Sequence, residues 1–553
     1  MSSSGRRERG RAALVLETLR GQWVTATVWV VGGGVANAAM ILSLKREMDS
    51  FPGGAAALAA SVLPAAEAMR PLRWPAERLD TLGGYTSYHN LTLFTLFLAI
   101  YAAIQGARSI RGAEDHHVLE EILATGRSRV SVVRDRAIGF VLTASVITLG
   151  LGAGVALGFV AAGEPQTARA LQALVAPGLG MLVGYGLGLL LAQLTASAPS
   201  AAGLASGLLV VAYVVENTWE DLGALAWLRY ASPFHYINRS RTLVPGQHLD
   251  LAASAALVGL AAALVLLATW AFVRRDYASA LWVVRRPTPP RTALPGRVTR
   301  GLLHSIAAAL VLRGRFGILA WSAGAFVYGT LMLFLEPSVL KMWSWFATFM
   351  PGGVSASAST PSEQYIDVST TLAVPFVAGV VVSQAAGWVR DLAQGRVEAV
   401  LAAPVSTPRL VLGRLAAAAA ASVIVGLGAL AGVLLGGAWS DVRLDAGGLL
   451  RVVGACLLLG LGLAGVASVV VAVFPGTLAV TVFGVVLGAS YLVGFLVGPM
   501  HWPAWVNRFS LVSLFGHPYL DWVEAVDAAV LGGLCVLGVL VGGLVVDRRP
   551  KAV

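Results

Sequence analysis

The sequence predicts an all-α polytopic membrane protein with twelve transmembrane helices in two homologous six-helix halves. Three observations support this fold class. Of the 553 residues, 57% are hydrophobic and only 12% are charged, and the mean hydropathy is +0.75. Apolar runs of about 20 residues, the length that crosses the hydrocarbon core of a bilayer, recur along the chain. Two charged segments also repeat at a fixed separation. This composition excludes an ordinary water-soluble fold.

Each half contains six apolar segments that are long enough to span a membrane. In the first half they lie at about 22–43, 89–110, 137–162, 168–194, 198–216 and 250–273. In the second half they lie at about 317–336, 369–389, 411–437, 447–473, 476–498 and 525–546. Residues 11–20 and 302–315 precede the first span of each half, and their apolar spacing predicts amphipathic helices at the membrane surface. We therefore expect halves at 1–273 and 301–553, joined by a proline- and arginine-rich cytoplasmic linker at 274–300.

The basic residues, which give a net charge of +11, lie between the spans rather than in one patch. Positive-inside topology explains this distribution better than nucleic-acid binding does. Both termini are therefore expected in the cytoplasm, and the chain in a bacterial plasma (inner) membrane. The longest outer loop is expected at residues 44–88, without a predicted structure or role. Cys456 and Cys535 lie in apolar runs, so neither a disulfide nor a cysteine metal site is expected.

The two charged segments follow the second span of each half. They are Glu114–Arg136 (EDHHVLEEILATGRSRVSVVRDR) and Arg390–Arg414 (RDLAQGRVEAVLAAPVSTPRLVLGR). Aligned without gaps at an offset of 278 residues, Glu120 falls on Glu398. Each segment starts with apolar residues at helical spacing beside carboxylates, and each then breaks, at Gly126 or Pro404. Each therefore predicts a short amphipathic helix followed by a turn, exposed between two spans.

Glycines at four-residue intervals inside the spans predict close packing of helices in lipid. They are Gly150, Gly154 and Gly158, then Gly180, Gly184 and Gly188, and Gly538 and Gly542. We expect them to serve packing rather than substrate binding.

Six spans with a lead-in amphipathic helix, and with "LEEILATGRSR" or "VEAVLAAPVSTPR" after the second span, resemble the permease subunits of type-2 ABC exporters. In that family the segment after the second span is the coupling helix, which docks onto an ATPase. Two such units in one chain, with a long outer loop after the first span, resemble the fused polyketide-antibiotic (tetronasin-type) exporter permeases of actinobacteria. The first copy departs from the family pattern, because Gly126-Arg127 stands where the pattern has a proline.

The resemblance implies two sets of functional residues. The coupling contacts would be Glu114, Glu120, Leu123, Thr125, Arg127 and Arg129 in the first half, and Arg396, Glu398, Leu401, Pro404, Ser406 and Arg409 in the second. The substrate path would be lined by the second and fifth spans of each half, at Phe94, Phe97, Tyr101, Tyr213, Phe376, Gln384, Phe483 and Tyr491. An aromatic wall with few charges suits large hydrophobic compounds. The alternatives are solvated loops for the first set and packing against lipid or neighbouring helices for the second.

The three lysines exclude a phosphate-binding loop on this chain. Such a loop needs a Gly-Lys-Ser/Thr run, and none of Lys45, Lys341 and Lys551 has one. We therefore expect a transport subunit that is not itself an enzyme and carries no cofactor. ATP and Mg²⁺ would bind to a partner, an ABC ATP-binding subunit present in two copies. The other expected partners are the lipid bilayer and a hydrophobic small-molecule substrate. Nucleic acid is not expected to bind.

The leading hypothesis is thus the permease subunit of an ATP-driven exporter of hydrophobic drugs or antibiotics. The main alternative is an ion-coupled secondary transporter of the major-facilitator type, which also has twelve spans in two halves. Such carriers usually need ionisable groups inside the membrane, whereas Glu216, Asp527 and Asp547 lie only at span ends. A third hypothesis, a membrane enzyme, lacks clustered acids, bases or metal ligands. Adjacent His116 and His117 would point in different directions on a helix, so we expect solvated surface there.

Overall fold

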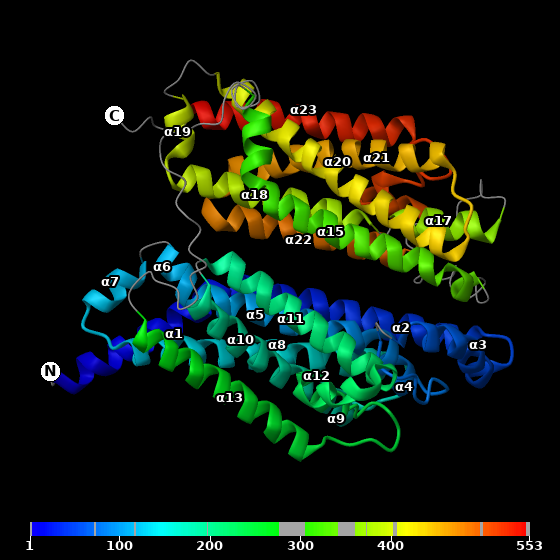
Figure 1. Cartoon of the computed structure of the whole chain (residues 1–553), viewed down its shortest axis with the longest axis horizontal. Helices are drawn as coiled ribbons and strands as arrows, with labels where there is room; N and C mark the ends of the chain where they lie inside the picture. Colours follow the sequence, from blue (N-terminus) through cyan, green and yellow to red (C-terminus); the bar gives the residue numbers. More distant parts are fainter. Residues whose placement is uncertain are drawn as a thin grey trace. The chain divides into compact units, whose positions relative to one another are not determined.

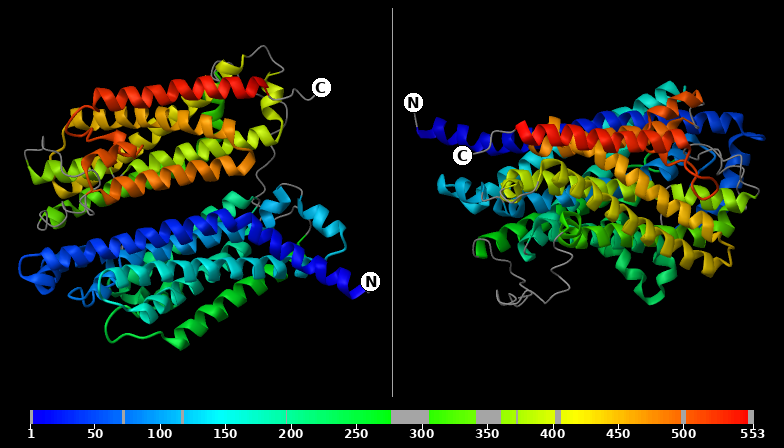
Figure 2. Two further views of the ribbon diagram at one scale, coloured as in Figure 1. Left: turned by 180° about the vertical axis from the view of Figure 1, so that it is seen from behind. Right: turned by 90° about the horizontal axis from the view of Figure 1, so that it is seen from above.

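Helices account for the regular structure of the residues that the computed structural model describes (Figure 1). It describes residues 3–70, 73–115, 118–195, 197–275, 305–340, 360–371, 373–401, 406–497 and 502–548. These residues form helices joined by turns and loops, and they include no strand. The predicted all-α fold is confirmed. Long helices lie side by side within each half of the chain (Figure 2).

The chain divides into two compact units, Met1–Thr288 (unit 1) and Pro289–Val553 (unit 2). The division falls within the segment expected to be the linker, residues 274–300. All of that linker beyond Arg275 lies outside the described residues, as do His116 and His117. Each unit is therefore described by itself below.

Unit 1 starts with a continuous helical stretch and ends with a long apolar helix. The elements are α1 (Ser3–Thr27), the π-helical turn η1 (Val28–Gly33), α2 (Gly34–Ser50), α3 (Gly54–Ala68), α4 (Leu82–Thr86), η3 (Ser87–Leu91), α5 (Thr92–Ala107), η4 (Arg108–Gly112), α6 (Ala113–Asp115), α7 (Val118–Ala124), α8 (Arg129–Ala161), α9 (Thr167–Ala173), α10 (Val175–Leu194), α11 (Ala198–Thr218), η5 (Trp219–Ala231), α12 (Pro233–Asn238) and α13 (Leu251–Arg274).

The described residues of unit 2 follow a similar order. Its elements are α15 (Ile306–Leu340), α17 (Pro361–Thr371), α18 (Val374–Ala393), α19 (Arg396–Leu401), α20 (Thr407–Ser440), α21 (Ala446–Val473), α22 (Gly476–Leu496), η7 (Ala504–Phe509), η8 (Ser513–Phe515) and α23 (Ala525–Arg548). We number the spans one to six within each unit. In unit 1 these are α1–α2, α4–α6, α8, α9–α10, α11 and α13. In unit 2 they are α15, α17–α18, α20, α21, α22 and α23.

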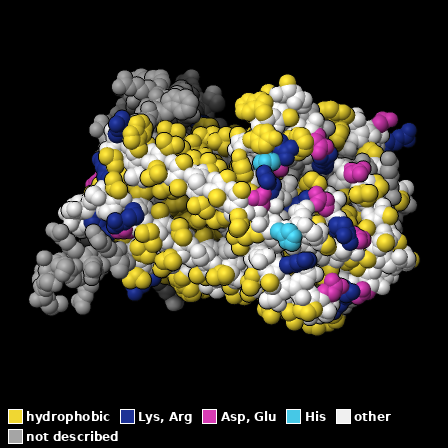
Figure 3. Space-filling view, turned by 90° about the horizontal axis from the view of Figure 1, so that it is seen from below, with side chains coloured by type: hydrophobic (Ala, Val, Ile, Leu, Met, Phe, Trp, Pro, Cys, Tyr) yellow, Lys and Arg dark blue, Asp and Glu magenta, His cyan; other side chains and the backbone are white. Residues whose placement is uncertain are grey.

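Eleven helical stretches among the described residues are long and apolar enough to cross a membrane, and they match eleven of the predicted spans. The remaining prediction, 476–498, falls on α22, whose apolar part at Leu478–Gly494 is shorter. Hydrophobic side chains cover the middle of the face shown in Figure 3, while charged side chains gather toward its ends. The chain is thus a multi-pass membrane protein, with about twelve spans.

The amphipathic segments expected before the first spans are not separate helices. Residues 11–20 lie within α1, and residues 306–315 form the start of α15, so each continues directly into its span. No proline interrupts either stretch, and a lone glycine such as Gly21 or Gly314 weakens a helix without ending it. In the N-terminal helix, Leu14 is buried in the unit, whereas the apolar side chains of Leu16 and Trp23 are exposed.

The outer loop predicted at residues 44–88 is shorter in the structure, because α2 continues to Ser50 and α4 begins at Leu82. The segment between these two helices contains α3, which composition alone did not define. After α2 the chain turns at Gly53 and Gly54, whose φ angles of +90° and +75° lie in the left-handed region that favours glycine. α3 then packs beside α2. Arg241 donates from its guanidinium to the Pro75 carbonyl at 2.8 Å, which ties this segment to the stretch between α12 and α13.

The glycine ridges serve close helix packing, as the sequence predicted. A methyl group added at Gly184 or Gly188 on α10 would come under 3.0 Å from the backbone of α5. The same addition at Gly154 on α8 would meet the backbone of α2, and at Gly538 on α23 the backbone of α21. These helices are therefore in backbone-to-backbone contact, which only glycine permits.

We predict that Gly106→Ala destabilises unit 1. Gly106 faces α10, and its new methyl group would overlap the Tyr185 carbonyl oxygen and lie 2.9 Å from the Leu189 nitrogen. Overpacking of this kind costs about 1–3 kcal/mol, so the unfolding temperature in detergent should fall. Gly207→Ala is the matched control, because nothing lies within 4 Å of its methyl position and alanine favours the helix. Equal unfolding temperatures for the two variants would contradict this packing.

Candidate functional site

The two short helices that the repeat predicts are present, α7 in unit 1 and α19 in unit 2 (Figure 1). Leu119 and Val397 occupy equivalent positions and are both buried. Glu120 and Glu398, the next residues, are both exposed. Each helix therefore directs an apolar side chain into its own unit and a carboxylate outward. Its length and outward charge fit a surface that another protein can contact.

The turn after α7 forms as the sequence predicts. Gly126 has a φ of +81°, and its N–H donates to the Leu123 carbonyl at 3.0 Å, which is the usual way that glycine ends a helix. The next long helix is preceded by Ser128 in unit 1 and by Ser406 in unit 2. These two residues have the same backbone angles, φ −73° and ψ 148°. Pro404, the predicted break in unit 2, lies outside the described residues.

In unit 1 a buried carboxylate holds the segment that leads into α7. Glu114, on α6, is 5% exposed. Its two oxygens bind Arg111 at 2.8 Å and Arg275 at 2.6 Å. The Nε of Arg275 also donates to the Gln193 side chain at 2.8 Å, and Arg111 donates to the Thr195 carbonyl. Burial lowers the pKa of the Arg275 guanidinium, and the neighbouring Glu114 carboxylate opposes that change.

Two further contacts attach this segment to the ends of other spans. The Asp115 carboxylate accepts from the Ala198 N–H at 3.2 Å, at the N-terminus of α11, where negative charge is favourable. Arg129, the first residue of α8, donates to the carbonyls of Phe272 and Arg275 at 2.9 and 2.6 Å. The two segments that flank α7 therefore contact the ends of spans four, five and six.

Unit 2 also has a buried carboxylate beside its short helix, but with different partners. Asp391, near the end of α18, is 7% exposed. It pairs with Arg313 of α15 at 3.2 Å, Arg396 of α19 at 3.3 Å and Arg414 of α20 at 3.0 Å. The guanidinium of Arg414 also lies over the Trp388 ring. Asp391 thus joins α19 to spans one and three.

The predicted coupling residues fall into three groups. Those whose side chains bind within their own unit are Glu114, Arg127 (to Asp135 at 3.1 Å), Arg129 and Arg396. Those that are exposed or half-buried on the surface are Glu120, Leu123, Thr125, Glu398, Ser406 and Arg409. The Leu401 side chain and Pro404 lie outside the described part of the structure. The second group thus lies on the surface of its unit, while the first group holds the two helices in place.

The predicted path residues of unit 1 do not form one wall. Phe94 and Tyr101 of span two both contact Trp29 of span one, with ring centroids 5.5 and 5.7 Å apart. Phe97 points away from the unit and is 52% exposed, whereas Tyr213 is 1% exposed. Spans two and five are neighbours, as α5 contacts α11. Two of the four predicted side chains thus come together, around a tryptophan that the sequence did not single out.

In unit 2, Phe376 of span two contacts Trp321 and Tyr328 of span one, with ring centroids 6.4 and 5.5 Å apart. Spans two and five are again neighbours. The other predicted path residues are the half-buried Gln384 and Tyr491 and the fully buried Phe483. Phe483 belongs to the core of the unit.

Sequence reasoning missed three of the arginines that neutralise the buried carboxylates, namely Arg111 and Arg275 beside Glu114 and Arg313 beside Asp391. Arg275 lies 161 positions from Glu114, so no local pattern joins them. Arg111 precedes Glu114 by three residues, a helical spacing that could have indicated an ion pair. The repeat did align Arg136 with Arg414. Arg136 donates to the Ser109 carbonyl, so both residues brace the start of span three against span two, each in its own unit.

We predict that Glu114→Ala destabilises the protein strongly, whereas Glu120→Ala does not. Removing one member of a buried ion-pair network leaves uncompensated charge and costs about 3–5 kcal/mol. Removing an exposed carboxylate, even one that is paired at the surface, changes stability by about 0–1 kcal/mol. Thermal unfolding of the purified variants in detergent measures both. If Glu114→Ala unfolds at the temperature of Glu120→Ala, Glu114 does not hold this segment.

Groups of three or more potential metal ligands are absent from the described part of the chain.

A search of curated proteins found no match to the sequence. A family model does match, described as "Multidrug efflux system permease Rv1217c, C-terminal domain", over residues 13–273 and 303–546. These two segments make up most of the chain and follow the division into two units. The chain therefore belongs to this family of multidrug efflux permeases.

Proposed function

We propose that this chain is the membrane-spanning permease subunit of an ATP-driven ABC exporter of hydrophobic drugs or antibiotics. The observation that carries the proposal is the repeated pair α7 and α19. Each lies between spans two and three, exposes a glutamate at the equivalent position and is braced by a buried carboxylate of its own unit. A partner that pushes on such a helix moves the attached spans rather than a loose loop.

In this proposal the energy comes from a separate ABC ATP-binding subunit, present in two copies, which binds ATP and Mg²⁺. One copy would contact α7 and the other α19. The chain would lie in the bacterial plasma (inner) membrane with both termini in the cytoplasm, on the same side as α7 and α19. The proposed substrates are polyketide antibiotics of the tetronasin type. The aromatic pairs around Trp29 and Trp321 support a hydrophobic substrate.

An ion-coupled secondary transporter is the second candidate, and one observation favours it. Asp367 lies in the membrane-spanning stretch Pro361–Ala393, is 1% exposed and contacts His517 at 2.6 Å. Buried ionisable groups in spans are typical of ion-coupled carriers. Asp367 lies near the start of span two, however, and a histidine already partners it.

A protonophore separates the two candidates. Drug efflux from cells should continue when the proton gradient is collapsed at constant ATP, because ATP hydrolysis drives the ABC exporter directly. Efflux and cellular ATP are measured in the same samples, and a strain without this gene gives the background. Loss of efflux at unchanged ATP would favour the ion-coupled carrier.

We predict that Glu120→Ala and Glu398→Ala each lower substrate-stimulated ATPase activity in the reconstituted complex. A hydrogen bond to a charged group is worth about 1.5–3 kcal/mol, so each loss should weaken coupling roughly tenfold or more. The double variant should be most impaired, and the single variants should differ because Glu114 and Asp391 anchor the two helices to different spans.

The matched control is Glu121→Ala, which removes the exposed carboxylate next to Glu120 on the same helix. Expression and unfolding temperature should stay unchanged in all of these variants. The permease alone should show no hydrolysis. Normal stimulation in the double variant would mean that α7 and α19 are not coupling helices.

A further inference from the structure

Three arginines share one carboxylate at the end of unit 2 that carries α19. One oxygen of Asp391 binds Arg414 at 3.0 Å. The other oxygen binds both Arg313 and Arg396, at 3.2 and 3.3 Å. One negative charge therefore faces three positive charges. We call Arg313, Arg396 and Arg414 the arginine cluster.

Two members of the arginine cluster are accessible from outside the unit. The side chains of Arg313 and Arg396 are 52% and 49% exposed, whereas that of Arg414 is 10% exposed. Both accessible guanidinium groups approach the same oxygen, so two like charges are held close together and repel each other. A second anion that contacts both groups would reduce this repulsion. Phosphate suits the position, because its oxygens accept the paired N–H groups of arginine.

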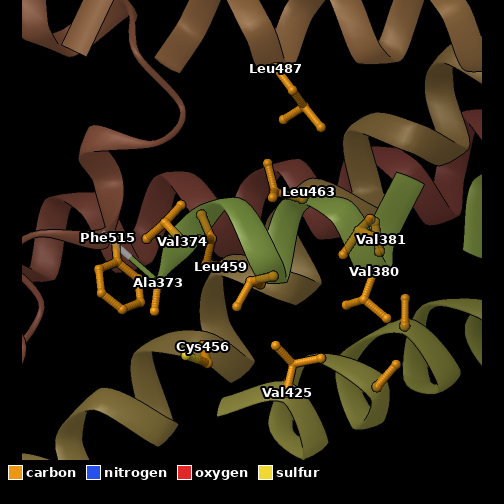
Figure 4. Packing of buried hydrophobic residues seen from close by; sticks show 14 of the residues in the cluster. Ala373, Val374, Val380, Val381, Val425, Cys456, Leu459, Leu463, Leu487 and Phe515 are labelled. Atoms are coloured by element: carbon orange, nitrogen blue, oxygen red, sulfur yellow. The ribbon is translucent and has the colours of Figure 1, made fainter. Parts of the chain in front are cut away.

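The arginine cluster rests on helices that pack into the core of unit 2. Val380 and Val381 of α18 lie among buried side chains of α20, α21 and α22 (Figure 4). Trp388, about one turn before Asp391, is also buried. The Arg414 guanidinium lies over the Trp388 ring, 5.2 Å from its centroid. Asp391 and Arg414 are thus fixed by the core, and the two accessible arginines gather around them.

The internal repeat shows that the crowding of positive charge belongs to unit 2. The five residues AALVL precede Glu17 in unit 1 and Arg313 in unit 2, so these two positions correspond. Arg136 corresponds to Arg414. In unit 1 the charge of Glu17 attracts Arg136, whereas in unit 2 the charge of Arg313 repels Arg414. Unit 2 therefore has like charges where unit 1 has opposite charges.

Exposed apolar side chains lie beside the arginine cluster on α15. Leu312, Phe316 and Leu319 are all exposed. Their spacing of four and three residues places them on one face of the helix, and Arg313 is next to Leu312 in the chain. This face continues from the cluster into the apolar part of span one. The combination fits a ligand that has an anionic head and hydrophobic tails better than it fits a water-soluble anion.

We propose that the arginine cluster binds one anionic phospholipid from the membrane leaflet on the side of α19. The lipid phosphate contacts Arg313 and Arg396, and the acyl chains lie along Leu312, Phe316 and Leu319. Basic sites between spans hold anionic headgroups in other membrane proteins. The bound lipid joins span one to α19, because Arg313 belongs to the first and Arg396 to the second. This binding does not require the proposed coupling to ATP.

The test measures lipid binding to the purified full chain in detergent by native mass spectrometry, without ATP or any partner. Anionic dioleoylphosphatidylglycerol is compared with dioleoylphosphatidylcholine, which has the same acyl chains and no net charge. Wild type should bind at least one phosphatidylglycerol about 25-fold more tightly than phosphatidylcholine, since each accessible arginine contributes about fivefold. Arg313→Gln/Arg396→Gln should bind one such lipid fewer. Arg414 still neutralises the buried Asp391 in that variant.

Three controls make the test specific. Arg443→Gln/Arg508→Gln removes two exposed arginines at the opposite end of unit 2 and should keep every tightly bound phosphatidylglycerol. Arg313→Lys/Arg396→Lys should also keep the lipid, because lysine binds phosphate as a point charge. Ion pairs with a purely structural role would not predict this rescue. Glycerol phosphate, which has no acyl chains, should not displace phosphatidylglycerol at the same concentration.

Three results would overturn the proposal. The first is no preference for phosphatidylglycerol in wild type, which would leave the arginines to an acidic protein partner. The second is an unchanged number of tightly bound lipids in Arg313→Gln/Arg396→Gln. The third is displacement by glycerol phosphate, which would make the ligand a soluble phosphate compound.

A single variant decides the matter if the double variant fails to fold. Arg313→Gln leaves two arginines on Asp391 and should weaken the tight phosphatidylglycerol about fivefold. Unchanged affinity in this variant would reject the site. None of these measurements depends on an ATPase partner, so their failure is distinct from failure of the exporter proposal.

Discussion

A buried carboxylate bound by arginines determines how each short helix is held. Burying an isolated carboxylate costs several kcal/mol in a protein interior, and only close, well-oriented cations repay that cost. Glu114 is buried with Arg111 and Arg275 at hydrogen-bonding distance. Shifting α6 away from the end of span six would separate Glu114 from Arg275 in a low-dielectric environment. The position of α6, which contacts α7, is therefore fixed to span six by this ion pair and to the end of span four by the hydrogen bond from Arg111 to the Thr195 carbonyl.

Both units stabilise a buried carboxylate with arginines, but the arginines come from different spans. Asp391 is bound from spans one and three, whereas Glu114 is bound from the end of span six and from its own span. Under the proposed mechanism, displacement of α7 is transmitted to spans four to six, and displacement of α19 to spans one and three. The equivalent helices would then move different parts of their units. This asymmetry follows from the identity of the anchoring residues and not from the short helices, which are alike.

The sequence was sufficient where the signal is local. Hydropathy located the spans, and the repeat located α7 and α19, because helical periodicity and glycine turns are properties of adjacent residues. It was insufficient where the outcome depends on tertiary contacts. Nothing in the local sequence distinguishes Glu114 from a surface carboxylate, because its partner Arg275 is far away in the chain. Tyr213 and Phe97 both suit an aromatic path by type, yet one is buried and the other faces outward, because helix rotation in a bundle is set by its neighbours.

The internal repeat also shows that two units with the same helix arrangement can have different core side chains at equivalent positions. The ridge glycines of α8 and α20 recur at equivalent positions, so both helices approach span one of their units at backbone contact. With the backbone spacing kept, a change in one side chain alters the space between the helices without moving them. At the offset of 278 residues, Leu151 of α8 falls on Ala429 of α20. These side chains differ by three carbon atoms, and partial collapse around a smaller residue is costly in a close-packed interior. Retained glycines thus maintain the backbone spacing of each unit, while single core substitutions change how the side chains pack between the helices of one unit.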